Sequence, residues 1–174
     1  GDEGLCPNAT FLEESPIDVI NEAVRLGASS NGSVRYSVEP IADSDGRCQV
    51  RPQFTFAYLS PKPLLQDYQK ALDRVGIHTA QMMDNRFGKG FLLGRSWDAL
   101  TVFSSIGGFI DGVKVERGRY CGLERNGVLR GLLAFRRNQS NNFATREKAL
   151  QTVEGCLEPP RNSTGRLLEM LVRA

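Results

Sequence analysis

Several ingredients of enzyme active sites are scarce in this sequence of 174 residues. The chain has one histidine, His78, and no Gly-x-Ser-x-Gly elbow, so a histidine-assisted nucleophile could use only this one base. His78 follows Gly76, which we expect to end a helix, and a lone histidine at such a place is usually structural or solvated. We therefore expect no catalysis by a nucleophile–histidine pair.

Patterns that hold metals or phosphates are also missing. Asp43-Ser44-Asp45-Gly46 resembles the opening of a calcium loop, but Phe54 stands where the twelve-residue loop requires a glutamate. We interpret this run as a turn. The stretch from Gly88 to Gly94 does not fit the dinucleotide fingerprint, and Gly94-Arg95-Ser96 has arginine where a P-loop has lysine. The sequence thus predicts no metal and no cofactor.

Long hydrophobic runs are absent, and no stretch approaches the 18 or more apolar residues of a membrane span. The first residues, Gly1-Asp2-Glu3-Gly4, are acidic and polar, unlike a leader peptide. We expect a mature fragment or ectodomain, with any membrane anchor beyond Ala174. Apolar residues make up 40% of the chain, which is enough for residues 1–174 to form one domain with a proper core.

Four Asn-x-Ser/Thr sequons are present, where composition predicts about one among the nine asparagines. They begin at Asn8, Asn31, Asn138 and Asn162. An acceptor asparagine must be exposed, and only chains on the secretory route meet the glycosylation enzymes. The alternative is that loops select Asn and Ser for turn formation. We expect glycosylation, and hence a secreted protein or one on the extracellular face of the membrane.

The cysteines agree with that compartment. There are four, widely spaced and without a Cys-x-x-Cys pair: Cys6, Cys48, Cys121 and Cys156. Two disulfides in an oxidising compartment are the favoured interpretation, and unpaired thiols of a cytosolic protein are the alternative. Three connectivities are possible. We prefer Cys6–Cys48 with Cys121–Cys156, because each bridge would tie a helical segment to a neighbouring strand.

Charge is unevenly distributed along the chain although the net charge is only +2. Residues 1–46 carry nine acidic and two basic side chains. Residues 113–137 carry a cluster of bases: Lys114, Arg117, Arg119, Arg125, Arg130, Arg136 and Arg137. Such a cluster could bind sulfated, sialylated or phosphorylated partners. The favoured alternative is that the acidic N-terminal region covers it or that solvent does, because the bases alternate between both faces of a predicted hairpin.

Periodicity predicts an α+β fold, with a mixed or antiparallel sheet of about four to five strands packed with several short helices. We expect strands at Val34–Val38 and Phe54–Tyr58. Helices are predicted from the cap Ser15 to Gly27, from Lys62 to Gly76, from Ser96 through Phe103, near Thr145–Gly155, and after Ser163 or Thr164.

Two further segments have functional interest. Arg119–Phe135 carries Asn126-Gly127 between apolar runs, which predicts a β-hairpin. Asp84–Gly94 is glycine-rich, and we expect an irregular loop of the kind that often binds partners. No sequon occurs in residues 54–135, so we expect the binding surface within that stretch.

Three functions remain open. The first is a non-catalytic glycoprotein domain that binds a protein receptor or an anionic glycan. Its contacts would be Arg86, Phe87 and Lys89 of the loop and Arg117, Arg119 and Arg125 of the hairpin. No nucleic-acid partner is expected, and contact with a membrane only through an anchor outside this chain.

The other two functions need a cavity. A small extracellular hydrolase could use paired carboxylates, but Glu13, Glu14 and Asp18 are not distinguishable from acids that favour a helix N-terminus. A carrier could line a cavity for an apolar ligand with Phe54, Phe56 and Tyr58. The alternative is that these rings fill an ordinary core.

Overall fold

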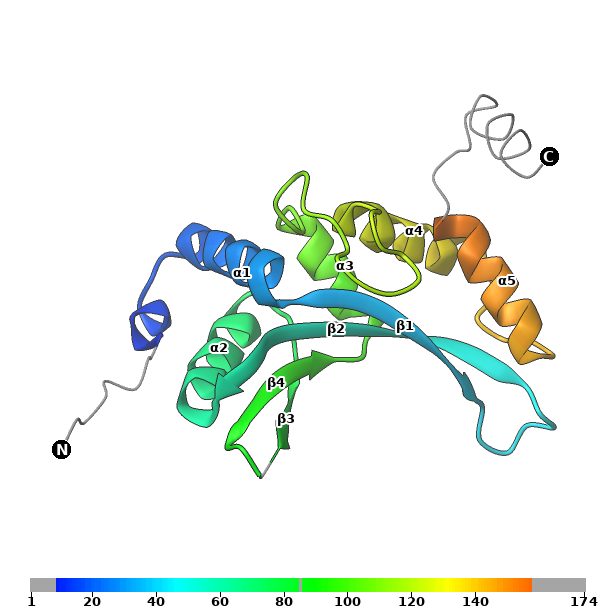
Figure 1. The fold of residues 1–174 in the computed structure, drawn as a ribbon, viewed down its shortest axis with the longest axis horizontal. Helices are drawn as coiled ribbons and strands as arrows, with labels where there is room; N and C mark the ends of the chain where they lie inside the picture. The colour runs from blue at the N-terminus through cyan, green and yellow to red at the C-terminus, as the bar shows by residue number, and fades with distance from the viewer. Residues whose placement is uncertain (1–8, 85, 158–174) are drawn as a thin grey trace.

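The computed structural model describes residues 9–84 and 86–157. Its fold is α+β, with a four-stranded antiparallel sheet and five α-helices in this part of the chain (Figure 1). The elements are η1 (Thr10–Glu13), α1 (Ile17–Asn31), β1 (Ser33–Pro40), β2 (Cys48–Pro61), α2 (Lys62–Arg74), β3 (Ala80–Asp84), β4 (Lys89–Gly94), α3 (Trp97–Ser105), α4 (Arg125–Asn138) and α5 (Arg146–Leu157).

The sheet has the strand order β1-β2-β4-β3, and β2 is its longest strand. Alternate residues of β1 and β2, among them Val34, Val38, Val50 and Phe54, are buried against the helices. The residues between them, such as Arg35 and Arg51, are exposed on the other face. In Figure 1, α1, α3, α4 and α5 follow one another along one side of the sheet. In the described part of the chain, no helix covers the opposite face of β1 and β2 (Figure 1).

Helix α1 runs past Gly27, where we expected it to end, and Pro16 rather than Ser15 is its N-cap. The Ser15 hydroxyl instead donates to the carbonyl of Phe11. Gly27 serves close packing, because a Cβ at this position would lie 2.6 Å from Cζ of Phe56. The glycine therefore lets the helix approach the sheet, and Gly32 is the residue at which the chain leaves the helix.

The predicted hairpin Arg119–Phe135 is wrong, since the second half of the segment is helix α4. Its buried residues Val128, Leu129, Leu132 and Phe135 follow a helical period. The Asn126 amide makes no turn. Its Oδ1 accepts the N–H of Phe109 at 2.8 Å and its Nδ2 donates to the Phe109 carbonyl at 2.8 Å. A tertiary contact has overridden the local hairpin signal.

The stretch Asp84–Gly94 is not an irregular loop, because β3 and β4 form a hairpin across it. Its glycines permit close backbone approach. A Cβ on Gly90 would lie 2.1 Å from the Met82 carbonyl oxygen, and Gly88 in the turn has a φ of +61°. The glycine content that indicated irregular structure is thus a requirement of strand pairing.

The disulfide prediction is not supported in the described residues, where Cys48, Cys121 and Cys156 are free thiols. Cys6 lies outside these residues. The Cys121–Cys156 pairing is not formed, and the two cysteines have different surroundings. Cys121 is exposed in the loop before α4, where its Sγ lies 3.1 Å from the Glu116 carbonyl oxygen. Cys156 is half-buried on α5 and packs against the core.

The other helices and strands that sequence periodicity predicts within the described residues are present in the structure. The strands around Val34–Val38 and Phe54–Tyr58 and the helices after Lys62 and near Thr145 are confirmed. The Ser96 hydroxyl oxygen accepts the N–H of Ala99 at 3.0 Å, as expected for a helix cap. The helix predicted after Ser163 or Thr164 lies outside the described residues. Among the helices that are described, none has the length and apolar character required to cross a membrane.

The contact between Gly27 and Phe56 makes a testable prediction. Gly27→Ala gains helix propensity but forces the new methyl against the ring, so we expect a net loss of about 1–2 kcal/mol in unfolding free energy. Gly155→Ala is the matched control, because nothing lies within 4 Å of its added Cβ. It should gain up to about 1 kcal/mol. Urea unfolding measures both, and equal effects of the two substitutions would contradict the packing account.

Candidate functional site

An irregularity in β2 produces the most unusual surface of the described structure. The register between β2 and β4 shifts between Phe56 and Ser60. Ala57 and Leu59, on either side of Tyr58, have φ values of +56° and +60°, in the left-handed region that non-glycine residues rarely adopt. Each such residue costs about 1–2 kcal/mol. Strain of this kind is concentrated at functional sites, which makes the bulge a candidate.

The bulge turns two large side chains outward. Phe54 and Phe56 are fully buried, whereas Tyr58 and Leu59 are 53% and 61% exposed. The Tyr58 ring packs on Phe91 of β4, with centroids 5.8 Å apart. Alternation along β2 predicts Tyr58 inside with the two phenylalanines, so periodicity alone missed this surface. The missing information was the bulge, which has no sequence signature here because its left-handed residues are not glycine.

The apolar surface continues across the β3–β4 hairpin. Met82 lies opposite Phe91 in the strand register and is 43% exposed. Phe87, in the turn, is 74% exposed. We define the bulge patch as Tyr58, Leu59, Met82, Phe87 and Phe91. Tyr58, Phe91 and Met82 are neighbours, and Leu59 and Phe87 add exposed apolar side chains in the bulge and in the turn. Exposed apolar side chains gathered in this way indicate an interaction site.

Basic residues border the bulge patch. Arg86 and Lys89 flank Phe87, and both are exposed. The backbone N–H of Arg86 donates to Oδ1 of Asp84 at 2.9 Å, which holds the turn. Within residues 9–84 and 86–157, no ion pair engages either basic side chain. The three residues predicted from the glycine-rich stretch thus lie together, at the tip of a hairpin rather than in a loop.

The predicted arginines of the second segment do not form one surface. Arg117 is exposed in the loop between α3 and α4, and Arg119 forms a bidentate ion pair with Glu154 of α5. The side chain of Arg125 is only 12% exposed. Its Nη1 donates to the carbonyls of Ser29 at 3.0 Å and Gly32 at 2.8 Å. Arg125 thus completes the C-terminal end of α1, and its guanidinium faces the protein.

The loop before α4 is held by a hydrogen bond between two tyrosines as well as by the Arg119–Glu154 ion pair. The hydroxyls of Tyr36 on β1 and Tyr120 in the loop are 2.8 Å apart. Burial is the larger cause and this hydrogen bond the smaller one, and together they raise the pKa of Tyr36 far above its usual range. The Tyr36 hydroxyl therefore keeps its proton to a higher pH than an ordinary phenol and acts as a structural contact between sheet and loop.

Two of the four sequons can be placed. Asn31 is the last residue of α1 and Asn138 is the last residue of α4, and both side chains are exposed. Asn8 and Asn162 lie outside the described residues. Asn31 is not remote from the sequon-free stretch, since its Nδ2 donates to the carbonyl of Tyr58 at 3.1 Å. Residues 54–135 are therefore not uniformly clear of potential glycans, because the fold brings Asn31 to the bulge.

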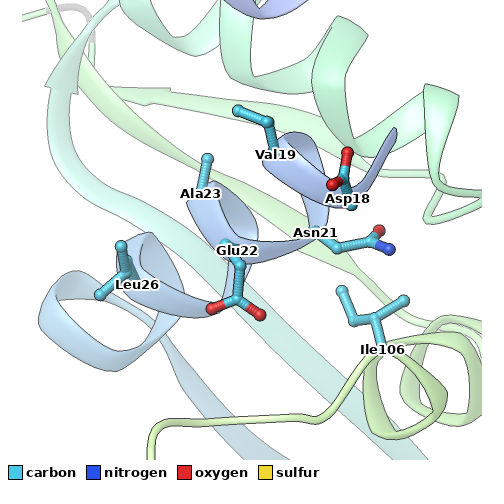
Figure 2. A pocket seen from close by; sticks show the side chains of 7 residues that line it. All are labelled: Asp18, Val19, Asn21, Glu22, Ala23, Leu26 and Ile106. Carbon is cyan, nitrogen blue, oxygen red and sulfur yellow. The ribbon is translucent and has the colours of Figure 1, made fainter. Parts of the chain in front are cut away.

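A hollow lies along the outer side of α1. It has a volume of about 510 Å³ and is lined by Asp18, Val19, Asn21, Glu22, Ala23, Leu26 and Ile106. In Figure 2 the Asp18 and Glu22 carboxylates and the Val19 and Leu26 side chains lie along α1, and Ile106 lies across from Asn21. The hollow is an open groove on the surface, in contrast to an enclosed ligand cavity.

Asp18, named for the hydrolase, lines this open groove, whereas Phe54 and Phe56, named for the carrier, lie in the core. The rings of Phe54 and Phe103 pack at 4.8 Å, and those of Phe56 and Tyr68 pack at 5.1 Å, within the core. Glu13 forms an ion pair with Lys70, and His78 is paired with Asp73 at the surface. No group of three or more His, Cys, Asp or Glu side chains is arranged for a metal ion in the residues that the structure describes.

Neither a scan against models of known protein families nor a search of curated proteins finds a match to this chain. The sequence and the geometry of the chain itself are therefore the guides to its function.

The bulge yields a prediction about strain. Asparagine tolerates left-handed φ better than leucine, so Leu59→Asn should raise the unfolding free energy by up to about 1 kcal/mol. Leu26→Asn is the control, because Leu26 is 59% exposed on an ordinary helix. It should be neutral or lose about 0.5 kcal/mol through helix propensity. A Leu59→Asn variant less stable than wild type in urea unfolding would show that the bulge is not strained.

Arg125 yields a prediction about the helix end. Arg125→Ala leaves part-buried carbonyls without donors, and we expect a loss of about 2–4 kcal/mol in unfolding free energy. Arg125→Lys should recover less than half of this, because one ammonium cannot replace both Nη1, which donates to the α1 carbonyls, and Nε, which donates to the Lys114 carbonyl. Arg130→Ala, an exposed arginine on the same helix, should stay within about 0.5 kcal/mol of wild type. Equal losses at positions 125 and 130 would contradict this role.

Proposed function

We propose that this chain is a non-catalytic domain of a secreted or cell-surface glycoprotein, and that it binds a protein partner through the bulge patch. The observation that carries the proposal is the exposure of Tyr58 and Leu59 by a strained bulge beside Phe91. Strained backbone residues are concentrated at functional sites, and here the strain presents two side chains that can bind a partner.

The composition of the patch favours a protein partner. Tyrosine, phenylalanine and methionine are enriched at protein interfaces, and aromatic anchors supply much of their binding energy. Arg86 and Lys89 at the hairpin tip add positive charge at the rim. The complementary partner has an apolar surface bordered by acidic side chains.

An anionic glycan is less well supported as the partner. Arg125 caps α1 and Arg119 is paired with Glu154, which leaves Arg117 as the unpaired member of that predicted trio within the described part of the chain. Recognition of an anionic glycan requires several basic side chains on one surface. Placement on the secretory route rests on the four sequons. The described cysteines give it no support, because they are unpaired.

The binding proposal is tested with a matched pair of phenylalanines. Phe87 in the bulge patch is 74% exposed and Phe11 in η1 is 66% exposed. Partners captured from the medium and surface of secretory cells by the wild-type chain are identified, purified and titrated against each variant. Phe87→Ser should weaken the dissociation constant by roughly 30-fold, as for loss of a hot spot worth about 2 kcal/mol. Phe11→Ser should leave it unchanged.

Three outcomes would overturn this assignment. Equal weakening by both variants would place the interface elsewhere. An Arg117→Ser, Arg119→Ser variant that loses both heparin retention and partner binding, while Phe87→Ser still binds the partner, would point to an anionic glycan. Concentration-dependent self-association of the wild type that Phe87→Ser abolishes would make the patch a contact between copies of this chain.

A further inference from the structure

Asn31 lies at the edge of the bulge patch although 27 residues separate it from Tyr58 in the sequence. The reason is the tight exit from α1. A Cβ on Gly32 would lie 2.8 Å from both the Ala28 carbonyl oxygen and the Thr55 carbonyl oxygen. The glycine therefore lets the chain pass directly from the helix into β1 alongside β2. Asn31, the residue before it, reaches the strained segment of β2.

The hydrogen bond of Asn31 is compatible with glycosylation. Glycosylation of Nδ2 replaces one of its two hydrogens and leaves one N–H. That remaining N–H can donate to the Tyr58 carbonyl, as Nδ2 does in the structure at 3.1 Å. The first sugar then leaves the amide beside the bulge, held by a contact that restricts its direction.

Asn31 contacts the backbone of the bulge, and the exposed side chains of the same segment suit a sugar. The pyranose ring of N-acetylglucosamine has a face of C–H groups, which packs on aromatic and aliphatic side chains as other apolar surfaces do. Tyr58 and Leu59 are both more than half exposed, at 53% and 61%. Covering them removes apolar area from water without further change in the fold.

We infer that an N-glycan on Asn31 packs over Tyr58 and Leu59 and screens this end of the bulge patch. The inference rests on the secretory placement in the proposed function, but not on the identity of a partner. The hairpin end of the patch, with Met82 and Phe87, remains open to the partner. Glycan occupancy at Asn31 then regulates how much of the patch is available.

Asn138 is the internal control. It is likewise the last residue of a helix with an exposed side chain, and its neighbours Arg136, Arg137 and Gln139 are polar. A glycan there lacks the exposed aromatic platform that Tyr58 supplies. Any protection specific to Asn31 therefore comes from the bulge and not from glycosylation in general.

The test is hydroxyl-radical footprinting of the full chain produced in a eukaryotic secretory host. Oxidation of Tyr58 and Leu59 is compared among wild type, Asn31→Gln and Asn138→Gln, with glycopeptide mass spectrometry reporting occupancy. We expect Tyr58 and Leu59 to be oxidised several-fold faster in Asn31→Gln and unchanged in Asn138→Gln, with Phe87 constant in all three. Trimming to a single sugar should retain part of the protection.

A thermal measurement provides a second readout. Trimming the glycans to a single sugar, which leaves the Asn31 amide intact, should lower the Tm of Asn138→Gln, and should lower it less when Tyr58→Ser is also present. Equal oxidation of Tyr58 with and without the Asn31 glycan would overturn the inference, as would an occupied Asn138 beside an empty Asn31. If no sequon is occupied, the secretory placement itself fails. Partner binding is not measured in either experiment, so its failure would be recognised separately.

Discussion

The arrangement of helices over the sheet depends on how the C-terminal end of α1 satisfies its backbone carbonyls. The last carbonyls of a helix have no partners within it, and here they lie against the start of α4. Arg125 donates to Ser29 and Gly32, and its Nε reaches the Lys114 carbonyl at 3.2 Å. The neighbouring Asn126 binds the backbone of Phe109. Two consecutive side chains thus join α1, the long loop and α4, and they set the position at which the chain enters β1.

That entry point also governs the open face of the sheet. There is no room for a side chain at position 32, and the glycine there lets β1 start directly beside β2. Asn31 consequently contacts the bulge. Phe56 before the bulge and Ser60 after it remain buried, so the change of orientation is confined to the residues between them. Of these, Ala57 is itself buried, whereas Tyr58 and Leu59 face solvent. The strained segment therefore links the core to the exposed bulge patch.

The sequence predicted local features well where neighbouring residues determine them. Ser96 caps α3, the strand at Val34–Val38 alternates, and the Asp43–Gly46 turn forms, because each depends on contacts within a few residues. It failed where distant residues decide. Asn126 binds Phe109, Gly27 makes room for Phe56, and Gly90 makes room for Met82, and none of these pairs is visible in a local pattern. Of the candidate site, the Arg86–Lys89 segment was anticipated, while Tyr58 and Leu59 required the bulge to be seen.

The Arg125 cap also has a consequence for the order of events during synthesis. It closes the end of α1 from 93 to 97 residues further along the chain. At roughly 5–20 residues per second, the ribosome needs several seconds to deliver it after Gly32 has been made. During that interval residues 28–32 cannot reach their final environment, and their carbonyls stay hydrated. An enzyme that acts on the nascent chain therefore encounters Asn31 in an unfinished helix end, before the bulge and its cap have come together around it.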